Sequence, residues 1–143
     1  MRRIYLASSW RNQNQPAAVL ALRAAGHEVY DFRNPAHGVA GFSWSEVSTV
    51  PPLLWTSREY LDALAHPAAE AGYACDMAAM QWCDTCVLLL PCGRSAHLEA
   101  GWCVGTGREV YVVHPSFEEP ELMAKMATGI VASVDELITL LEG

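Results

Sequence analysis

Residues 86–107 read CVLLLPCGRSAHLEAGWCVGTG. Their apolar run, Val87–Leu90, ends at Pro91, and a short loop of small residues, Cys92–Ser95, separates it from a helical pattern. A buried strand, a turn and the start of a helix account for this order, which is typical of an open α/β sheet. Ligands of such sheets bind at the carboxyl ends of the strands, so this loop is the first candidate for a functional site.

Two polar side chains follow at helical spacing. Ser95 and Glu99 are four residues apart, which places them on one face of a helix. A hydroxyl and a carboxylate would then both face the cleft above the strand. The alternative is that Ser95 caps the helix and Glu99 is a solvent-exposed charge, because capping serines and exposed glutamates are common.

Strand and helix patterns alternate along the rest of the chain. Strands are expected at residues 3–8, 27–32, 87–90, 109–114 and 129–132, and helices at 13–25, 57–65, 68–83, 96–104, 118–126 and 134–141. The first helix should have Pro16 in its first turn, Gly26 just past its end and an apolar stripe of Val19, Leu20 and Leu22.

This alternation predicts an α/β fold. We expect residues 1–143 to form a single flavodoxin-like (Rossmann-like) doubly wound domain with a five-stranded parallel sheet in the order 2-1-3-4-5. The switch point then lies between strands one and three. It brings the loop at residues 8–12 opposite the loop at 92–99, with the helix that contains Asp76 alongside. Asp76 is an acid among small and apolar residues, so it requires a partner or a function.

A long connection, Arg33–Val50, carries the aromatic residues Phe42 and Trp44. A loop of this length in a compact domain is usually functional, so these aromatics are expected to cover a planar ligand. The alternative is that they only pack onto the domain.

Composition narrows the class of function. The formal net charge is −7, which argues against binding of a nucleic-acid backbone. The 52% hydrophobic and 17% charged composition fits a globular domain, and no apolar run reaches the ~20 residues of a membrane span. The N-terminus enters a strand pattern without the apolar region of a signal peptide, so a cytoplasmic location is expected.

The five cysteines are odd in number and are expected to be reduced. Cys83 and Cys86 have the spacing of a redox or zinc motif, but no second pair and no suitably spaced histidine accompany them. We therefore expect them to pack as small apolar side chains and expect neither a metal nor a cofactor.

Three segments, in this order, resemble nucleoside 2-deoxyribosyltransferases and their nucleotide N-glycosidase relatives. They are IYLASSWRN at residues 4–12, CDMAAMQWCD at 75–84 and GRSAHLEAGW at 93–102. The similarity extends from Ile4 to about Val113, while the last thirty or so residues are generic α/β sequence. It implies a homodimer or higher homo-oligomer, although the C-terminal segment that completes a neighbouring subunit's site in some members has no clear counterpart.

The resemblance implies a role for each matching residue. Glu99 stands where the family has the nucleophile that attacks the anomeric carbon, and Tyr5 stands where a phenol orients that glutamate. Asp76 matches an aspartate that binds the sugar hydroxyls or handles the proton of the base. Trp10 is in a position to stack on the base.

The resemblance also indicates the kind of substrate. In members that act on 5′-monophosphates, serines and an arginine hold the phosphate, and Ser9, Arg11 and Ser95 could do so here. Many transferases have an acid six residues before the nucleophile, where this chain has Gly93 followed by Arg94. This departure favours an anionic substrate. His97 replaces a small residue of the family and is expected to be structural, because it points away from Glu99 across the helix.

The chemistry of N-glycosidic cleavage fits these roles. Its oxocarbenium-like transition state is stabilised by a carboxylate near the anomeric carbon, while a second acid assists departure of the base. A covalent intermediate lets water or a second base complete the reaction. We therefore expect an N-glycosidase or 2-deoxyribosyltransferase acting on a small nucleoside or nucleotide. One alternative is a non-catalytic nucleotide-binding sensor. A flavin-binding electron carrier is less favoured, because this sequence lacks the Ser/Thr-rich loop that such carriers have after the first strand.

Overall fold

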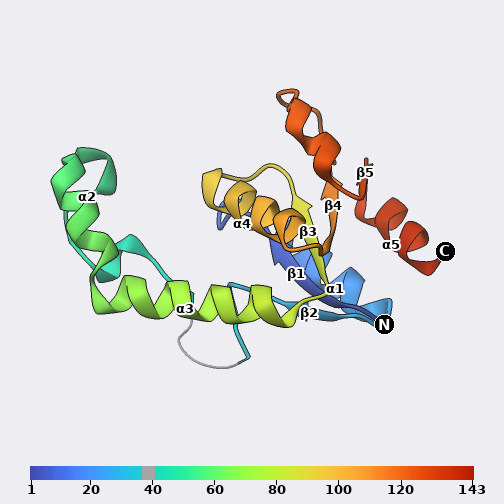
Figure 1. Ribbon diagram of the computed structural model, residues 1–143, viewed down its shortest axis with the longest axis horizontal. Helices are drawn as coiled ribbons and strands as arrows, with labels where there is room; N and C mark the ends of the chain where they lie inside the picture. Colours follow the sequence, from blue (N-terminus) through green and yellow to red (C-terminus); the bar gives the residue numbers. More distant parts are fainter. Residues whose placement is uncertain (37–40) are drawn as a thin grey trace.

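A parallel five-stranded sheet forms the centre of the molecule (Figure 1). The computed structural model describes residues 1–36 and 41–143. The strand order is β2-β1-β3-β4-β5, as the sequence predicts. The strands are β1 (Arg3–Ala7), β2 (Glu28–Tyr30), β3 (Thr85–Leu89), β4 (Glu109–Val113) and β5 (Gly129–Val131).

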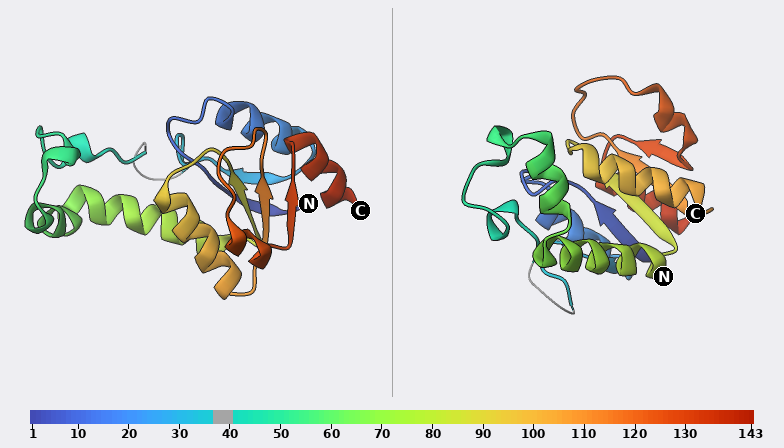
Figure 2. Two further views of the ribbon diagram at one scale, coloured as in Figure 1. Left: turned by 90° about the horizontal axis from the view of Figure 1, so that it is seen from above. Right: turned by 60° about the vertical axis from the view of Figure 1, so that its left-hand side comes forward.

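Two helices cover each face of the sheet (Figure 2). One face carries α1 (Gln15–Ala24) and α5 (Val134–Glu142), and the other carries α3 (Pro67–Trp82) and α4 (Arg94–Gly105). Successive side chains of β1 alternate between the two cores, because neighbouring residues of a strand point to opposite faces. Ile4 and Leu6 lie in the core under α1 and α5, whereas Tyr5 and Ala7 lie in the core under α3 and α4.

The first helix shows both a confirmed and a wrong prediction. Pro16 lies in the first turn of α1, and Gly26 follows the helix with a φ of +95°, which favours glycine. The predicted apolar stripe is wrong at Leu20, which is exposed. The buried face instead uses Ala18 with Val19 and Leu22, because the helix is rotated so that Gln15 also points inward.

The segments outside this layered core are short helices and loops. They include the 3₁₀ helices η1 (Trp44–Glu46), η2 (Pro52–Leu54) and η3 (Leu122–Met126) and the α-helix α2 (Ser57–Leu64). A helix over residues 118–126 was expected, but residues 118–121 are not helical and the rest is the 3₁₀ helix η3. Pro120 explains the late start, because a proline disfavours helix in the residue before it.

Helix α2 and the beginning of α3 extend away from the sheet (Figure 1). The Thr56 side chain accepts a hydrogen bond from Glu59 N at 3.1 Å, and the Glu59 carboxylate accepts from Thr56 N at 3.2 Å. This reciprocal cap begins α2. Helix α2 ends at Leu64, and α3 starts at Pro67. In the described part of the chain, no helix combines the length and apolar character needed to cross a bilayer.

Candidate active site

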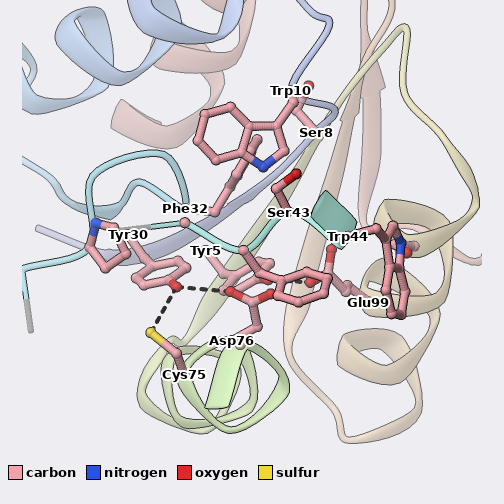
Figure 3. Close-up of a pocket in the computed structure, with 15 residues that line it drawn as sticks. Tyr5, Ser8, Trp10, Tyr30, Phe32, Ser43, Trp44, Cys75, Asp76 and Glu99 are labelled. Atoms are coloured by element: carbon pink, nitrogen blue, oxygen red, sulfur yellow. Dashed lines mark hydrogen bonds between the residues drawn. The ribbon is translucent and has the colours of Figure 1, made fainter. Parts of the chain in front are cut away.

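A cavity of about 610 Å³ lies beside the carboxyl ends of β1 and β2, on the face covered by α3 and α4 (Figure 3). The walls come from the strand ends, the two helices and the loop that precedes η1. The residues that line it are Tyr5, Ser8, Trp10, Tyr30, Phe32, Pro35, Gly41, Phe42, Ser43, Trp44, Gly72, Cys75, Asp76, Ser95 and Glu99. Two carboxylates and a set of aromatic rings therefore face one space.

Tyr5 and Glu99 form the first phenol–carboxylate pair of the cavity. Tyr5 is 1% exposed, and its hydroxyl donates a hydrogen bond to Oε2 of Glu99. Strand β1 supplies the phenol and helix α4 supplies the carboxylate, so 94 residues of chain separate the partners. A residue buried in the central strand can hold a carboxylate in one orientation, because its own position is fixed by packing on all sides.

Burial changes the acidity of this pair. It raises the pKa of Glu99 to about 7, with a further increase from the charge of Asp76, while the hydrogen bond from Tyr5 opposes both. Burial and the nearby carboxylates also raise the pKa of Tyr5, so its hydroxyl stays protonated and remains a donor. A carboxyl group with a pKa near 7 is partly ionised at neutral pH, which suits either a nucleophile or an acid–base group.

The alternative of a capping serine and an exposed glutamate is wrong. Helix α4 begins at Arg94 with Gly93 in the capping position, and no side chain caps it. Ser95 lines the cavity instead, and Glu99 is only partly exposed, with its carboxylate held by Tyr5.

Tyr30 and Asp76 form a second phenol–carboxylate pair (Figure 3). The Tyr30 hydroxyl donates to Oδ1 of Asp76 at 2.8 Å, and the sulfur of Cys75 lies 3.3 Å from the same hydroxyl. Burial raises the pKa of Asp76, and the hydrogen bond from Tyr30 partly offsets this increase. Asp76 thus has the partner that its apolar surroundings require. Tyr30 was not among the residues predicted from the sequence, although its place at the end of β2 beside β1 could have indicated it.

The residues predicted to bind substrate divide into two groups. Trp10 and Ser95 line the cavity, whereas Ser9, Arg11, Gly93 and Arg94 do not. Arg11 and Arg94 are exposed. Among the described lining residues there is no lysine, arginine or histidine, so a cationic side chain that binds an anion would come from outside these residues. His97 also lies outside it, where its Nδ1 is 2.9 Å from the carbonyl oxygen of Gly93.

Asn12 holds the two facing loops together, as the predicted switch point requires. Its side chain is 3% exposed, and its Nδ2 donates to the carbonyl oxygens of Leu89 and Pro91 at 3.4 and 3.2 Å. The same amide donates to Oγ of Ser8 at 3.0 Å. The loop after β1 is therefore tied to the loop after β3 at the mouth of the cavity.

Arg33 fixes the position of Trp10. Its guanidinium donates to the carbonyl oxygens of Trp10 and Asn12 and lies 5.5 Å from the centre of the Trp10 ring. Phe32 packs edge-on against the same indole with ring centres 5.5 Å apart. Sequence reasoning missed Arg33, because its partners are main-chain oxygens of a distant loop.

Phe42 and Trp44 line the cavity, as expected for aromatics that cover a ligand. They also pack against other aromatic residues, which was the alternative. The ring centres of Phe42 and Trp44 lie 4.8 Å apart, and those of Trp44 and Trp55 lie 5.5 Å apart. Residues 37–40 of the long connection lie outside the described residues. Gly72 of α3 allows the close approach, since a Cβ placed there would come within 2.8 Å of Cβ of Phe42.

We predict that Gly72→Ala weakens substrate binding. The added methyl group must displace Phe42 from the cavity wall, because real Cβ atoms do not approach this closely. KM should rise about threefold to tenfold with a smaller change in kcat, which is the pattern for lost contacts common to substrate and transition state. Gly105→Ala is the control, since a Cβ at Gly105 meets no atom within 4 Å. An unchanged KM would show that Phe42 does not contact the substrate.

None of the five cysteines forms a disulfide, and three of them are buried. Cys83 donates from its sulfur to the carbonyl oxygen of Met80 at 3.1 Å, and Cys86 lies in the core strand β3. Both pack as small apolar side chains, as predicted. Within residues 1–36 and 41–143, no three His, Cys, Asp or Glu side chains form a group that could hold a metal ion.

No protein-family model and no curated protein matches the chain. Solved structures do match it. A 2-deoxyribosyltransferase of Bacillus psychrosaccharolyticus shares 18% identity with a TM-score of 0.59, over 94% of this chain and 89% of the enzyme. A CMP N-glycosidase of Clostridium botulinum shares 15% identity with a TM-score of 0.53, over 99% of this chain and all of the enzyme.

A conserved protein of Enterococcus faecalis shares 15% identity with a TM-score of 0.63, over 99% of this chain and 98% of that one. At these identities the similarity concerns the fold. It agrees with the resemblance read from the three sequence segments. The chain therefore has the α/β fold of a 2-deoxyribosyltransferase and of a CMP N-glycosidase.

Proposed function

We propose that this protein cleaves or transfers the N-glycosidic bond of a nucleoside or a nucleoside 5′-monophosphate through a covalent glycosyl-Glu99 intermediate. The observation that carries the proposal is the pairing of Glu99 with Tyr5 opposite Asp76 in one aromatic cavity. The similarity in fold to a 2-deoxyribosyltransferase and a CMP N-glycosidase supports the same class of reaction.

In the first half of the reaction, a carboxylate oxygen of Glu99 attacks the anomeric carbon of the sugar. The C–N bond breaks, its electron pair moves to the nitrogen of the base, and Asp76 supplies the proton that the base takes up. Tyr5 keeps Glu99 aimed at the sugar through the hydrogen bond to Oε2. Orientation of this kind matters because a reacting atom must be held within about 3–3.5 Å of its target.

In the second half, the glycosyl ester is released. Attack by water on the anomeric carbon gives free sugar and makes the protein an N-glycosidase, whereas attack by a second base makes it a transferase. In both cases Glu99 leaves as a carboxylate, and the attacking water or base loses a proton. The two outcomes differ only in which acceptor reaches the ester first.

The aromatic walls suit a planar base. Trp10 and Phe32 pack against each other in the cavity wall. Phe42 lies just before η1, and Trp44 is its first residue. Rings of this kind bind bases by stacking, with about 1–3 kcal/mol for each stacked base. Gly41 allows Trp10 to approach this loop, because a Cβ there would overlap the indole ring.

A 5′-phosphate would lie on the side of the cavity where Ser95 and the start of α4 are. Ser95 lines the cavity, and Arg11 is adjacent to Asn12, whose side chain donates to the loop that leads to α4. The first main-chain amides of α4 add further donors. We propose that Arg11, Ser9 and Ser95 bind the phosphate with the neighbouring Gly93 and Arg94.

The test is release of free base from a panel of nucleosides and 5′-monophosphates, followed by chromatography. We expect release from at least one member of the panel. Arg11→Ala should weaken binding of the 5′-monophosphate about tenfold, which is typical of one lost hydrogen bond to a charged group, and leave the nucleoside unchanged. Added salt should reduce the preference for the phosphate. Equal affinity of the unmodified protein for both forms would contradict the phosphate site.

Binding without release of base from any member of the panel would instead indicate the non-catalytic nucleotide sensor. A visible spectrum excludes or identifies a bound flavin. The homo-oligomeric assembly and the cytoplasmic location stay predictions. Sedimentation of the purified protein tests the first of these.

A further inference from the structure

Strand register explains why the cavity contains two phenol–carboxylate pairs. Tyr5 and Tyr30 are partners in the parallel pairing of β1 with β2, so their side chains leave the sheet on the same face. Their rings stack with centres 5.3 Å apart and an interplanar angle of 15°. The two hydroxyls therefore reach the cavity side by side, one at Glu99 and the other at Asp76.

The hydrogen bonds around Tyr30 have one direction when Asp76 is ionised. A phenol has one proton, and Asp76 as a carboxylate can only accept, so Tyr30 donates to Oδ1 at 2.8 Å. The sulfur of Cys75, 3.3 Å from the same oxygen, must then be the donor in its contact with Tyr30. The chain of donors runs from Cys75 through Tyr30 to Asp76 and ends on Oδ1.

This direction distinguishes the two oxygens of Asp76. As long as Tyr30 donates to Oδ1, that oxygen is an acceptor, and a proton that Asp76 takes up resides on Oδ2. We propose that Tyr30 is the positioning residue of Asp76: by holding Oδ1, it presents Oδ2 to the substrate as the acid that protonates the departing base. This inference rests on the proposed function and assigns a residue to the step in which the base leaves.

The proposed step conserves protons and electrons. The C–N bond pair moves to the base nitrogen, the proton of Oδ2 moves to the base, and Asp76 is left with a negative charge. The hydrogen bond from Tyr30 then becomes charge-assisted, and such bonds are about twice as strong as neutral ones. Because the bond strengthens as the charge develops, it stabilises the transition state more than the bound substrate, which is the condition for acceleration.

Acidity is consistent with this geometry. Burial raises the pKa of Asp76, which favours a protonated acid, and the hydrogen bond from Tyr30 acts in the opposite direction. Removing the phenol hydroxyl should therefore raise the pKa of Asp76 further. A stronger hold on the proton makes Asp76 a weaker acid toward the base.

The test compares Tyr30→Phe with the unmodified protein on two substrates of the same sugar. One is a nucleoside, whose base needs a proton to leave, and the other is a 4-nitrophenyl glycoside, whose leaving group departs as an anion. Tyr30→Phe should lower kcat on the nucleoside about tenfold or more, since a general acid contributes about 10²–10⁴-fold. It should change kcat on the 4-nitrophenyl glycoside less than about twofold.

A second readout is the pH profile. The alkaline limb of kcat on the nucleoside should move to higher pH in Tyr30→Phe, because Asp76 keeps its proton longer. Cys75→Ala, which removes the other end of the donor chain, should give a smaller loss confined to the nucleoside. If Tyr30→Phe does not fold, Cys75→Ala still tests the inference. Tyr73→Phe is the matched control, because Tyr73 is exposed on the same helix as Asp76 and does not line the cavity.

Equal losses on both substrates would show that Tyr30 only supports the structure and would overturn the inference. An unchanged rate on the nucleoside would overturn it as well. Failure of the proposed function has a different signature: the unmodified protein would release no base, or Glu99→Ala would retain the full rate on both substrates. The two failures are therefore distinguishable in one set of measurements.

Discussion

Glu99→Ala protein should release base at least about 10³-fold more slowly than the unmodified protein. The substitution removes the atom that forms the bond to the anomeric carbon, and loss of a nucleophile is among the largest single effects known in enzymes. Neighbouring carboxylates do not replace it, because Asp76 is held by Tyr30 and belongs to a different helix. Residual activity would come from binding and from Asp76 alone.

The measurement is the rate of base release from the best substrate of the panel, with binding followed separately by calorimetry. Affinity of Glu99→Ala should stay within about tenfold of the unmodified protein, so that the loss appears in kcat. Glu70→Ala is the matched control, because Glu70 is an exposed glutamate of α3 outside the cavity. Mass spectrometry of the protein with a slow 2-fluoro substrate should find the glycosyl group on the peptide that contains Glu99. An undiminished rate in Glu99→Ala would contradict the assigned role.

Activity should also fall steeply in mild acid. Burial raises the pKa of Glu99 to about 7, so below that pH the carboxyl group is mostly protonated and is not a nucleophile. We expect kcat/KM to drop about tenfold for each pH unit below about 7, since this ratio reports the ionisation of the free enzyme. Tyr5→Phe removes the hydrogen bond that lowers the pKa of Glu99, so this acidic limb should move to higher pH and the maximum rate should fall.

Stability should change in the opposite direction with pH. The native pKa of Glu99 is about 7 and its usual value is 4.5, so between these values the folded state binds more protons than the unfolded state. The contribution of Glu99 to the free energy of unfolding therefore decreases as the pH rises from about 4.5 through 7. Glu99→Gln should gain stability relative to the unmodified protein between pH 5 and pH 8, as measured by urea denaturation. Two results would show that Glu99 is not buried as described: an acidic limb of kcat/KM near pH 4.5, or no gain in stability in Glu99→Gln.

Local patterns were sufficient for most elements of the sheet. The apolar run before Pro91 and the repeated change of period along the chain predict β3, its neighbours and their order, because hydrophobic periodicity reflects which face is buried. They were insufficient at Leu20, where the direction of the helix face was wrong, and at residues 118–121, where a helical composition gives no regular helix. At Leu20 packing against the sheet outweighs local preference. At residues 118–121 the reason is local, because Pro120 disfavours helix in the residue before it.

For the site, too, the sequence predicted some features and the folded chain decided others. Glu99 was a candidate because of its place in the helix after the apolar run, Asp76 because of its small and apolar neighbours, and Tyr5 because of the family resemblance alone. The family resemblance implied that Tyr5 contacts Glu99, and the folded chain has this hydrogen bond. That Tyr30 holds Asp76 and that Arg33 fixes Trp10 followed only from the folded chain. These contacts join residues 23 to 94 positions apart, and their geometry depends on strand register and on the packing of α3 and α4, which no local pattern encodes.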